Sequence, residues 1–230
     1  MQDVCVEGRF CGRTPRYHAI PIAGSAIAIA RVVTPPIPLA VSRRYDRAML
    51  EADRAPIVIL DEAHVIVWAN PAWFRFFEDN GGRDLALVQL GASYLAGIQG
   101  KLREFYKLVF ETCRESGLPF EQDYECSSAT EQRFYRLRAL PVENRDLVVS
   151  HQLRSVSARP DAPEATPDFA RYVSPEGIVV QCSNCRRLRT VEEEPTWEWV
   201  AEAVRAPPRR VSHGICHLCE GHYYFGGHDP

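Results

Sequence analysis

Four cysteines near the end of the sequence have the type and spacing of a metal site. Cys182 and Cys185 form one CxxC pair, and Cys216 and Cys219 form a second. Two residues between paired cysteines let both thiolates face one ion from a tight turn, and two such pairs complete the tetrahedron that zinc prefers. We therefore predict a zinc-ribbon-like site with these four ligands. Structural disulfides or a redox switch, and an iron–sulfur centre, stay open as alternatives.

The predicted site is structural rather than catalytic. Four cysteines fill every position around a tetrahedral ion, so no position is open for a reactive water. Three histidines, His213, His217 and His222, lie close to the second pair. We leave them outside the ligand set and expect His213 to brace the site by bonding a thiolate or a backbone group. Such an ion would stabilise a module too small to fold on apolar burial alone.

The composition is that of an ordinary soluble chain. Hydrophobic residues make up 46% and charged residues 25% of the 230 residues, and the formal net charge is -3. No global basic field would attract nucleic acid or a membrane surface, so we expect neither as a partner. The apolar stretch at 19–33 is too short to cross a bilayer. Its weak likeness to a signal peptide conflicts with the predicted metal ligands, which need a reducing compartment. We expect a cytoplasmic protein.

A regular order of strands and helices precedes the cysteines. β-Branched runs at 57–61 and 64–70 predict a hairpin, and Asn70 followed by Pro71 predicts a helix start. Apolar residues at helical spacing predict a second helix over 101–116. Segments of alternating polarity then predict three strands, at 120–126, 133–142 and 146–153. This order predicts an α+β fold, in which a five-stranded antiparallel sheet carries helices on one face.

Composition also divides the chain into parts. Residues 1–48 hold scattered prolines and arginines without a sustained period, and we expect a disordered lead or an incorrectly assigned start. Translation from Met49 would then lose no structure. Residues 55–154 form the sheet domain, residues 155–168 have the composition of a linker, and residues 169–230 form the four-cysteine module.

Several phrases follow one another in the segment 56–153: IVILDEAHVIVWAN, NPAWFRFF, LGASYLAGIQG and the closing strands that end in VVSH. In this order they resemble a PAS domain, the sensory module common in bacterial signalling proteins. The resemblance covers under half of the chain. It implies a sensor or interaction module that holds a small ligand between sheet and helices, or that dimerises.

Two cofactors of that family can be tested on the residues. Flavin-binding members carry an Asn-Cys phrase on a helix, and none occurs between Pro71 and Ser116. Haem-binding members use a helix histidine, and none lies between His64 and His151. Neither haem nor flavin is therefore supported, and zinc is the cofactor that we predict.

Other polar and aromatic residues have plainer interpretations. We expect His64 and His151 to be half-buried strand residues with one hydrogen-bond partner each. The aromatic residues of the first helix region are expected to be core rather than the wall of a ligand pocket: Trp68, Trp73, Phe74, Phe76 and Phe77. Three arginines of one strand are expected to line a solvated or partner-docking face rather than an anion site: Arg133, Arg136 and Arg138.

The C-terminal module also has a recognisable order. A CxxC pair, a tryptophan and the phrase SHGIC-x-x-C follow one another, with His217 where a proline is expected. This order resembles a cysteine-rich tail of bacterial PAS and response-regulator proteins. Between the pairs, residues 186–191 predict a strand, and Pro195 with Thr196 predicts the start of a helix over 197–204.

These features together predict a sensor or adaptor in bacterial signal transduction and no enzyme. The PAS-like part would sense or form a homodimer, and the zinc module would contact a separate signalling protein, such as a kinase or regulator. The alternative is a transcription-associated regulator whose module binds phosphates through arginines: Arg186, Arg187, Arg189, Arg205, Arg209 and Arg210. Five nearby glutamates nearly cancel that charge: Glu192, Glu193, Glu194, Glu198 and Glu202. A zinc enzyme would need an open coordination position.

Overall fold

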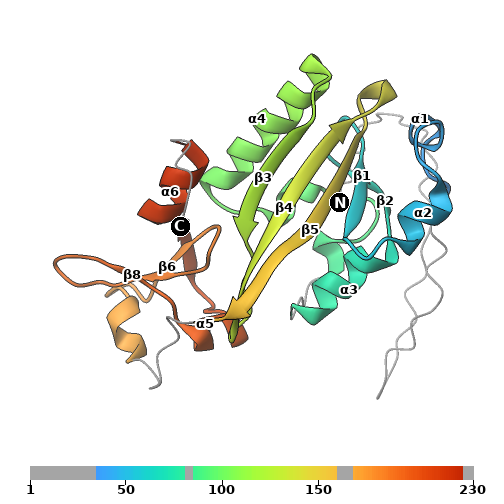
Figure 1. Ribbon diagram of the computed structural model, residues 1–230. Helices are drawn as coiled ribbons and strands as arrows, with labels where there is room; N and C mark the ends of the chain where they lie inside the picture. Colours follow the sequence, from blue (N-terminus) through green and yellow to red (C-terminus); the bar gives the residue numbers. More distant parts are fainter. Residues whose placement is uncertain (1–34, 81–84, 160–167, 225–230) are drawn as a thin grey trace, which may run out of the picture. The chain divides into compact units, whose positions relative to one another are not determined.

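The computed structural model describes residues 35–80, 85–159 and 168–224, all within one unit of the chain, Thr34–Pro230. The larger sheet has five antiparallel strands in the order β2-β1-β5-β4-β3 (Figure 1). The strands are β1 (Ile57–Leu60), β2 (Ile66–Ala69), β3 (Phe120–Glu125), β4 (Glu131–Pro141) and β5 (Leu147–Ala158). The predicted five-stranded antiparallel sheet is confirmed.

Alternation within the strands separates an inner from an outer face. In β4, Leu137 and Ala139 are buried in the main core, whereas Arg138 between them is exposed. In β1 every residue is buried, because Val58 faces the main core and Ile59 belongs to a second apolar cluster. A strand covered on both faces reads as a continuous apolar run, which is the pattern of its sequence.

Two helices cover the inner face, and both begin and end where the sequence indicates. The side-chain oxygen of Asn70 accepts hydrogen bonds of 3.0 Å from the first turn of α3 (Pro71–Asp79) and from Ile57 in β1. One capping residue thus fixes the helix start against the sheet. The longer α4 (Lys101–Ser116) packs its apolar stripe on the core and ends at Gly117, whose φ of 70° is left-handed. Short 3₁₀ turns join the elements: η1 (Leu85–Leu87), η2 (Tyr94–Gly97), η3 (Glu143–Arg145) and η4 (Phe169–Tyr172).

Two short helices precede the sheet and correct the expected lead of residues 1–48. These are α1 (Leu39–Ser42) and α2 (Arg47–Ala52). Val41 and Leu50 join the apolar cluster on the outer face, where they pack with Trp68. A chain that began at Met49 would lose this cover, so the expectation that nothing structural precedes it is wrong. Residues 1–34 lie outside the described residues.

The C-terminal module is built on a second sheet in the order β8-β7-β6-β9. Its elements are β6 (Val179–Cys182), β7 (Leu188–Arg189), β8 (Trp197–Glu198), α5 (Ala201–Arg205), β9 (Val211–Gly214) and α6 (His217–Tyr224). The pair β6 and β9 is parallel, and the other pairs are antiparallel. A small apolar core of its own lies around Tyr172 and Leu188. No described helix combines the length and the apolarity that a bilayer crossing needs.

Two further expectations differ from the structure. The predicted helix over 197–204 is wrong in its first half, because Trp197 and Glu198 pair with β7 as a strand. Aromatic residues favour strands, and the position of a Cβ on Gly214 would lie 3.3 Å from the Trp197 ring. The expected linker at 155–168 also begins later, because β5 stays paired with β4 as far as Ala158.

Candidate metal centre

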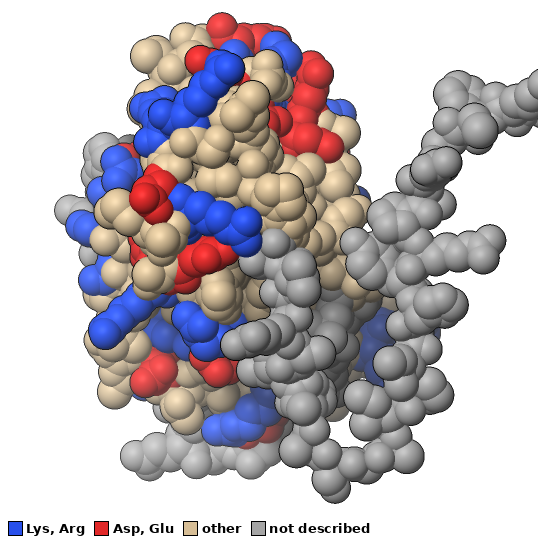
Figure 2. Space-filling view, turned by 90° about the vertical axis from the view of Figure 1, so that its right-hand side faces the viewer, with Lys and Arg blue, Asp and Glu red and all other residues tan. Residues whose placement is uncertain are grey.

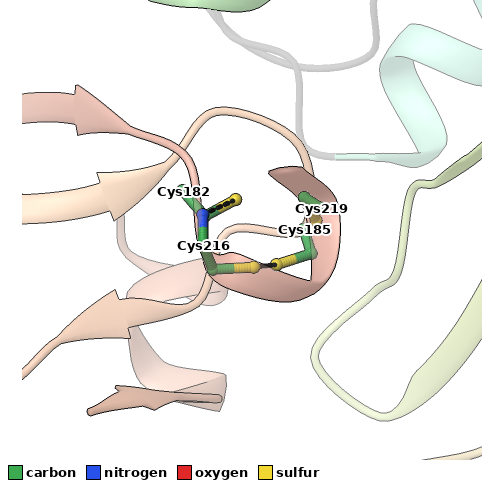
Figure 3. A group of neighbouring side chains, drawn as sticks. All are labelled: Cys182, Cys185, Cys216 and Cys219. Atoms are coloured by element: carbon green, nitrogen blue, oxygen red, sulfur yellow. Dashed lines mark hydrogen bonds between the residues drawn. The ribbon is translucent and has the colours of Figure 1, made fainter. Parts of the chain in front are cut away.

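The four predicted ligands lie together in the structure. Cys182 ends β6 and Cys185 follows one tight turn later, while Cys216 follows β9 and Cys219 lies in the first turn of α6. The parallel register of β6 and β9 sets Cys182 opposite Gly214 and so brings the two pairs to one place. All four Sγ atoms lie within 4.8 Å of one another. Their side chains converge in Figure 3.

The donor set fits a tetrahedral ion. Metal–sulfur bonds of about 2.3 Å require sulfurs about 3.8 Å apart in a regular tetrahedron, and the Sγ atoms of Cys185 and Cys216 lie 3.7 Å apart. All four are free thiols and all are buried. A tetrahedral set of four sulfurs is a ligand field for zinc or for iron, and with four protein ligands it leaves no position for water.

Contacts among the four thiols shift their pKa values in opposite directions, down for Cys182 and Cys185 and up for Cys216 and Cys219. Hydrogen bonds with Cys185, and then with Cys216 and Cys219, hold the pKa of Cys182 far below its usual value. The same kind of contacts, with Cys182 first, raise the pKa of Cys216 and Cys219, and burial raises both further. A cluster without a cation therefore keeps protons on some of its sulfurs. A divalent cation removes this conflict because it stabilises every coordinating thiol as the thiolate.

Two hydrogen-bond donors support the sulfurs from outside the set. The backbone N of Cys216 lies 3.4 Å from the Sγ of Cys182 (Figure 3). The Nδ2 of Asn184 lies 3.2 Å from the Sγ of Cys219. Donors to a thiolate stabilise its charge and orient it. The bracing role that we expected of His213 thus belongs to Asn184, since the His213 side chain is exposed on β9.

Asn184 also links the site to the sheet domain. Its Oδ1 accepts a hydrogen bond of 3.1 Å from the hydroxyl of Tyr223 in α6, and that hydroxyl lies 3.3 Å from the hydroxyl of Tyr106 in α4. Burial raises the pKa of Tyr106 to about 12, so its hydroxyl stays protonated. The four cysteines belong to the same buried cluster as the core of the sheet domain. The four cysteines and the core of the sheet domain are therefore in direct contact.

A buried ionic junction makes a second link between the two parts. Glu125 at the end of β3 lies 2.6 Å from a guanidinium nitrogen of Arg159 and 3.5 Å from one of Arg187, which follows the first cysteine pair. The hydroxyl of Ser127 donates to the same carboxylate at 2.6 Å. The Arg159 guanidinium stacks over the Trp199 ring at 3.5 Å. Breaking one member of such a buried network leaves an uncompensated charge.

The two histidines of the sheet domain are buried rather than half-buried, and each has two polar neighbours instead of the one partner expected. His151 in β5 is buried, with the Tyr94 hydroxyl 3.1 Å from Nε2 and the Tyr124 hydroxyl 2.7 Å from Nδ1. His64 lies in the turn after β1 and not in a strand, with a left-handed φ of 61°. Its Nε2 lies 2.9 Å from a guanidinium nitrogen of buried Arg114. Both imidazole rings take part in buried polar contacts that belong to the fold.

The expected aromatic core and arginine face are confirmed only in part. Phe77 belongs to none of the described apolar clusters, and Arg133 bonds the carbonyl of Cys126 and the side chain of Asn80. Trp68 is fully buried on the outer face, and Trp73 packs on the main core. Phe76 packs against Tyr135 and borders an open groove of ≈ 440 Å³. On the outer face of the sheet, the arginines form a ladder of cross-strand ion pairs with acidic residues of β3: Arg136 with Asp123, and Arg138 with Glu121.

Sequence reasoning missed Asn184, Tyr223, Glu125 and Arg159. Asn184 lies between the first two cysteines, so its position in the turn was a usable signal for a supporting residue. The other three carried no local signal, because their partners lie far away in the sequence.

Comparison with known proteins gives structural matches only. No family model matches the chain, and no curated protein sequence does. Among solved structures, the chain is similar to a domain of the sensory box sensor histidine kinase/response regulator from Geobacter sulfurreducens. That match has 15% identity and a TM-score of 0.35 and covers 46% of this chain and 89% of that one. The chain is also similar to the PAS domain of nitrogen regulation protein NR(II) from Vibrio parahaemolyticus, with 18% identity, a TM-score of 0.29 and coverage of 47% and 94%.

Proposed function

We propose that the chain is a PAS-type sensor or adaptor of bacterial signal transduction, cytoplasmic, whose C-terminal module is held by a structural zinc ion. The observation that carries the proposal is the closed set of four buried cysteines in contact with the core of a PAS-like sheet domain. Residues Cys182, Cys185, Cys216 and Cys219 would bind the ion. Zinc bound in this way supplies folding energy and no reactive water.

The proposal assigns the module to protein contacts rather than catalysis. A closed tetrahedron offers neither a nucleophile nor a position for a substrate oxygen. The ion would fix the turn after β6 and the start of α6. The protein surface around these two segments would then keep a single conformation. A separate kinase or regulator that recognises this surface would provide the output.

The proposed homodimer has support in the N-terminal helices. Leu39 of α1 is 68% exposed and Met49 of α2 is 74% exposed, on helices whose other sides are buried against the sheet. Large apolar side chains on the outside of a covering layer are suited to a contact between protein surfaces. We propose the second copy of this chain as the partner.

The alternative of a nucleic-acid-binding module is disfavoured by the contacts of three of its six arginines. The guanidinium groups of Arg186 and Arg187 contact Ser127 and Glu125 of the sheet domain. That of Arg205 pairs with Glu202. Figure 2 shows the side of the molecule on which α1 and α2 lie, not the side of the module, and basic and acidic side chains are interspersed there too. Phosphate binding requires basic groups that are not already neutralised.

Native mass spectrometry of the full-length chain, with metal analysis of the same sample, tests the proposal. We expect one zinc ion per chain and the mass of a dimer. A sample in which Cys182, Cys185, Cys216 and Cys219 are all alkylated readily and no metal is present contradicts the structural-zinc assignment, and a monomer at all concentrations contradicts the homodimer.

A further inference from the structure

We infer that the sheet domain responds to protons: protonation of His64 weakens the bonds by which Arg114 holds two turns of the sheet in place. The proton is then the signal of the proposed sensor, on whose function this inference rests. None of the groups involved is a metal ligand, so the response to protons and the zinc content of the protein are tested separately.

Arg114, in the last turn of α4, joins two turns at the same end of the sheet. Its side chain is fully buried. The Nη2 donates at 2.7 Å to the carbonyl of Asp61, in the turn between β1 and β2. The Nε donates at 2.8 Å to the carbonyl of Arg145, in η3 between β4 and β5. One buried guanidinium therefore ties both turns to α4.

Both turns contain left-handed residues, a conformation that is uncommon outside glycine. The angle φ is 61° at His64, 61° at Asn144 and 63° at Arg145. Such conformations cost free energy and persist only where the surrounding structure holds them. Two of these three residues, His64 and Arg145, contact Arg114 directly. The contacts of Arg114 therefore hold turns that would otherwise relax.

His64 is neutral in this arrangement. Its Nε2 lies 2.9 Å from the Nη1 of Arg114, and a guanidinium can only donate. Nε2 is therefore the acceptor, and the ring proton lies on Nδ1. A second proton, on Nε2, would turn the acceptor into a donor and bring two positive charges together. Burial, and then the charge of Arg114, accordingly lower the pKa of His64 below its usual value.

Glu111 is the carboxylate that can stabilise a proton on His64. Its Oε1 lies 3.4 Å from the Nε2 of His64 and 3.6 Å from the Nη1 of Arg114. Other charged groups near these side chains come from α4 and from both turns: Lys107, Asp61, Glu62, Arg145 and Asp146. A protonated His64 would compete with Arg114 for Glu111. Protonation therefore removes one partner of Arg114 and draws away part of a second.

The turn at η3 also contacts α1. The Nη1 of Arg43 lies 2.9 Å from the carboxylate of Glu143, and the Nη1 of Arg44 lies 3.5 Å from the carbonyl of Pro141. α1 carries Leu39, one of the two exposed apolar residues of the proposed dimer contact. Loosening of this turn in acid would therefore loosen α1 as well, which gives the proton signal an output.

Amide hydrogen exchange on the full-length protein, at about pH 7.5 and about pH 5.5, tests this response over the range in which histidines change charge. We expect protection factors at the lower pH to fall by at least about threefold at 61–65, 142–146 and 41–45, the effect of one lost hydrogen bond. Residues 120–125, at the other edge of the sheet, should keep theirs. Equal protection at both pH values overturns the inference. A loss at the two turns with 41–45 unchanged overturns the output through α1.

Histidine variants test the assignment to His64. His64→Gln keeps an acceptor for Arg114 but takes up no proton, so its protection should not depend on pH. His151→Gln is the matched control: burial lowers the pKa of His151 to about 4, so His151 stays neutral at about pH 5.5 and the response should persist in this variant. Asparagine tolerates a left-handed φ, so His64→Asn takes the place of His64→Gln if the latter does not fold. A response that persists without His64, or that is lost in His151→Gln, overturns the assignment.

Glu111→Gln gives a readout that a purely structural His64 would not move. Without the carboxylate the pKa of His64 should fall further, because Glu111 raises it in the wild type. NMR titration of the His64 ring measures the shift. An unchanged pKa in Glu111→Gln, or a wild-type pKa at or above the usual value, contradicts the inference. A protein without zinc or without a dimer contradicts the proposed function instead, and it leaves this titration unaffected.

Discussion

The side-chain amide of Asn184 lies 3.2 Å from the Sγ of Cys219, across the two cysteine pairs. One residue of the first turn thus supports a ligand supplied by the second. The contact orients the Cys219 thiolate and places a donor against its negative charge. It also explains why the turn at Cys182–Cys185 and the start of α6 form one structural unit.

Replacement of Asn184 by alanine should weaken zinc binding by about tenfold to a hundredfold, the usual cost of losing a group that bonds a metal ligand. Competition with a chromogenic chelator measures the change. Ser183→Ala is the control, because the Ser183 hydroxyl bonds the carbonyl of Gly214 and no sulfur. Equal zinc affinities for the two variants would show that the Asn184 contact does not contribute to zinc binding.

Replacement of Cys219 by serine should cost at least about 2 kcal/mol of zinc-binding free energy, roughly thirtyfold in Kd, because one of four thiolate ligands is lost. Metal analysis after dialysis measures it. Cys126→Ser serves as the control, since Cys126 lies outside the cluster. If Cys219→Ser retains zinc as firmly as Cys126→Ser, the ligand assignment is wrong.

The stability of the sheet domain should fall in mild acid because of His151. Burial lowers its pKa to about 4, below the usual value of about 6.5. Between these values the unfolded chain binds a proton that the folded chain excludes, so the free energy of unfolding falls as the pH falls from about 6.5 toward 4. The slope approaches about 1.4 kcal/mol per pH unit. Denaturant titrations at several pH values should show a smaller slope for His151→Gln than for the wild type; identical slopes refute this.

Val41→Ala should destabilise the fold by about 2 kcal/mol, because it removes two buried methyl groups from the outer apolar cluster. Ser42→Ala is the control in the same short helix, where the side chain is exposed, and it should change stability by less than about 0.5 kcal/mol. Thermal or denaturant unfolding distinguishes the two. Equal effects would mean that α1 does not cover the sheet.

The parts of the fold with strong local patterns could be predicted from the sequence. The helix at 101–116 carries its own apolar stripe and glycine end, and Asn70 with Pro71 marks a helix start without any distant partner. The cysteine pairs likewise carry their chemistry in their spacing. Each of these signals lies within a few turns of chain.

The remainder depends on distant partners. Trp197 has helix-like neighbours, yet it pairs with Arg189 in a strand and packs on Gly214. The residues around Val41 show no helical or strand periodicity, and Val41 is buried because it packs on the apolar outer side of β1. The bond between Tyr106 and Tyr223 joins residues 117 positions apart in the sequence, so no local pattern could predict it.

The central claim is that Cys182, Cys185, Cys216 and Cys219 hold one zinc ion in a closed tetrahedron. X-ray absorption at the zinc edge of the purified full-length protein tests it most directly. The account predicts four sulfur neighbours at about 2.3 Å and no nitrogen or oxygen neighbour. A spectrum with a histidine or water ligand, or a protein that carries iron or no metal, would contradict it.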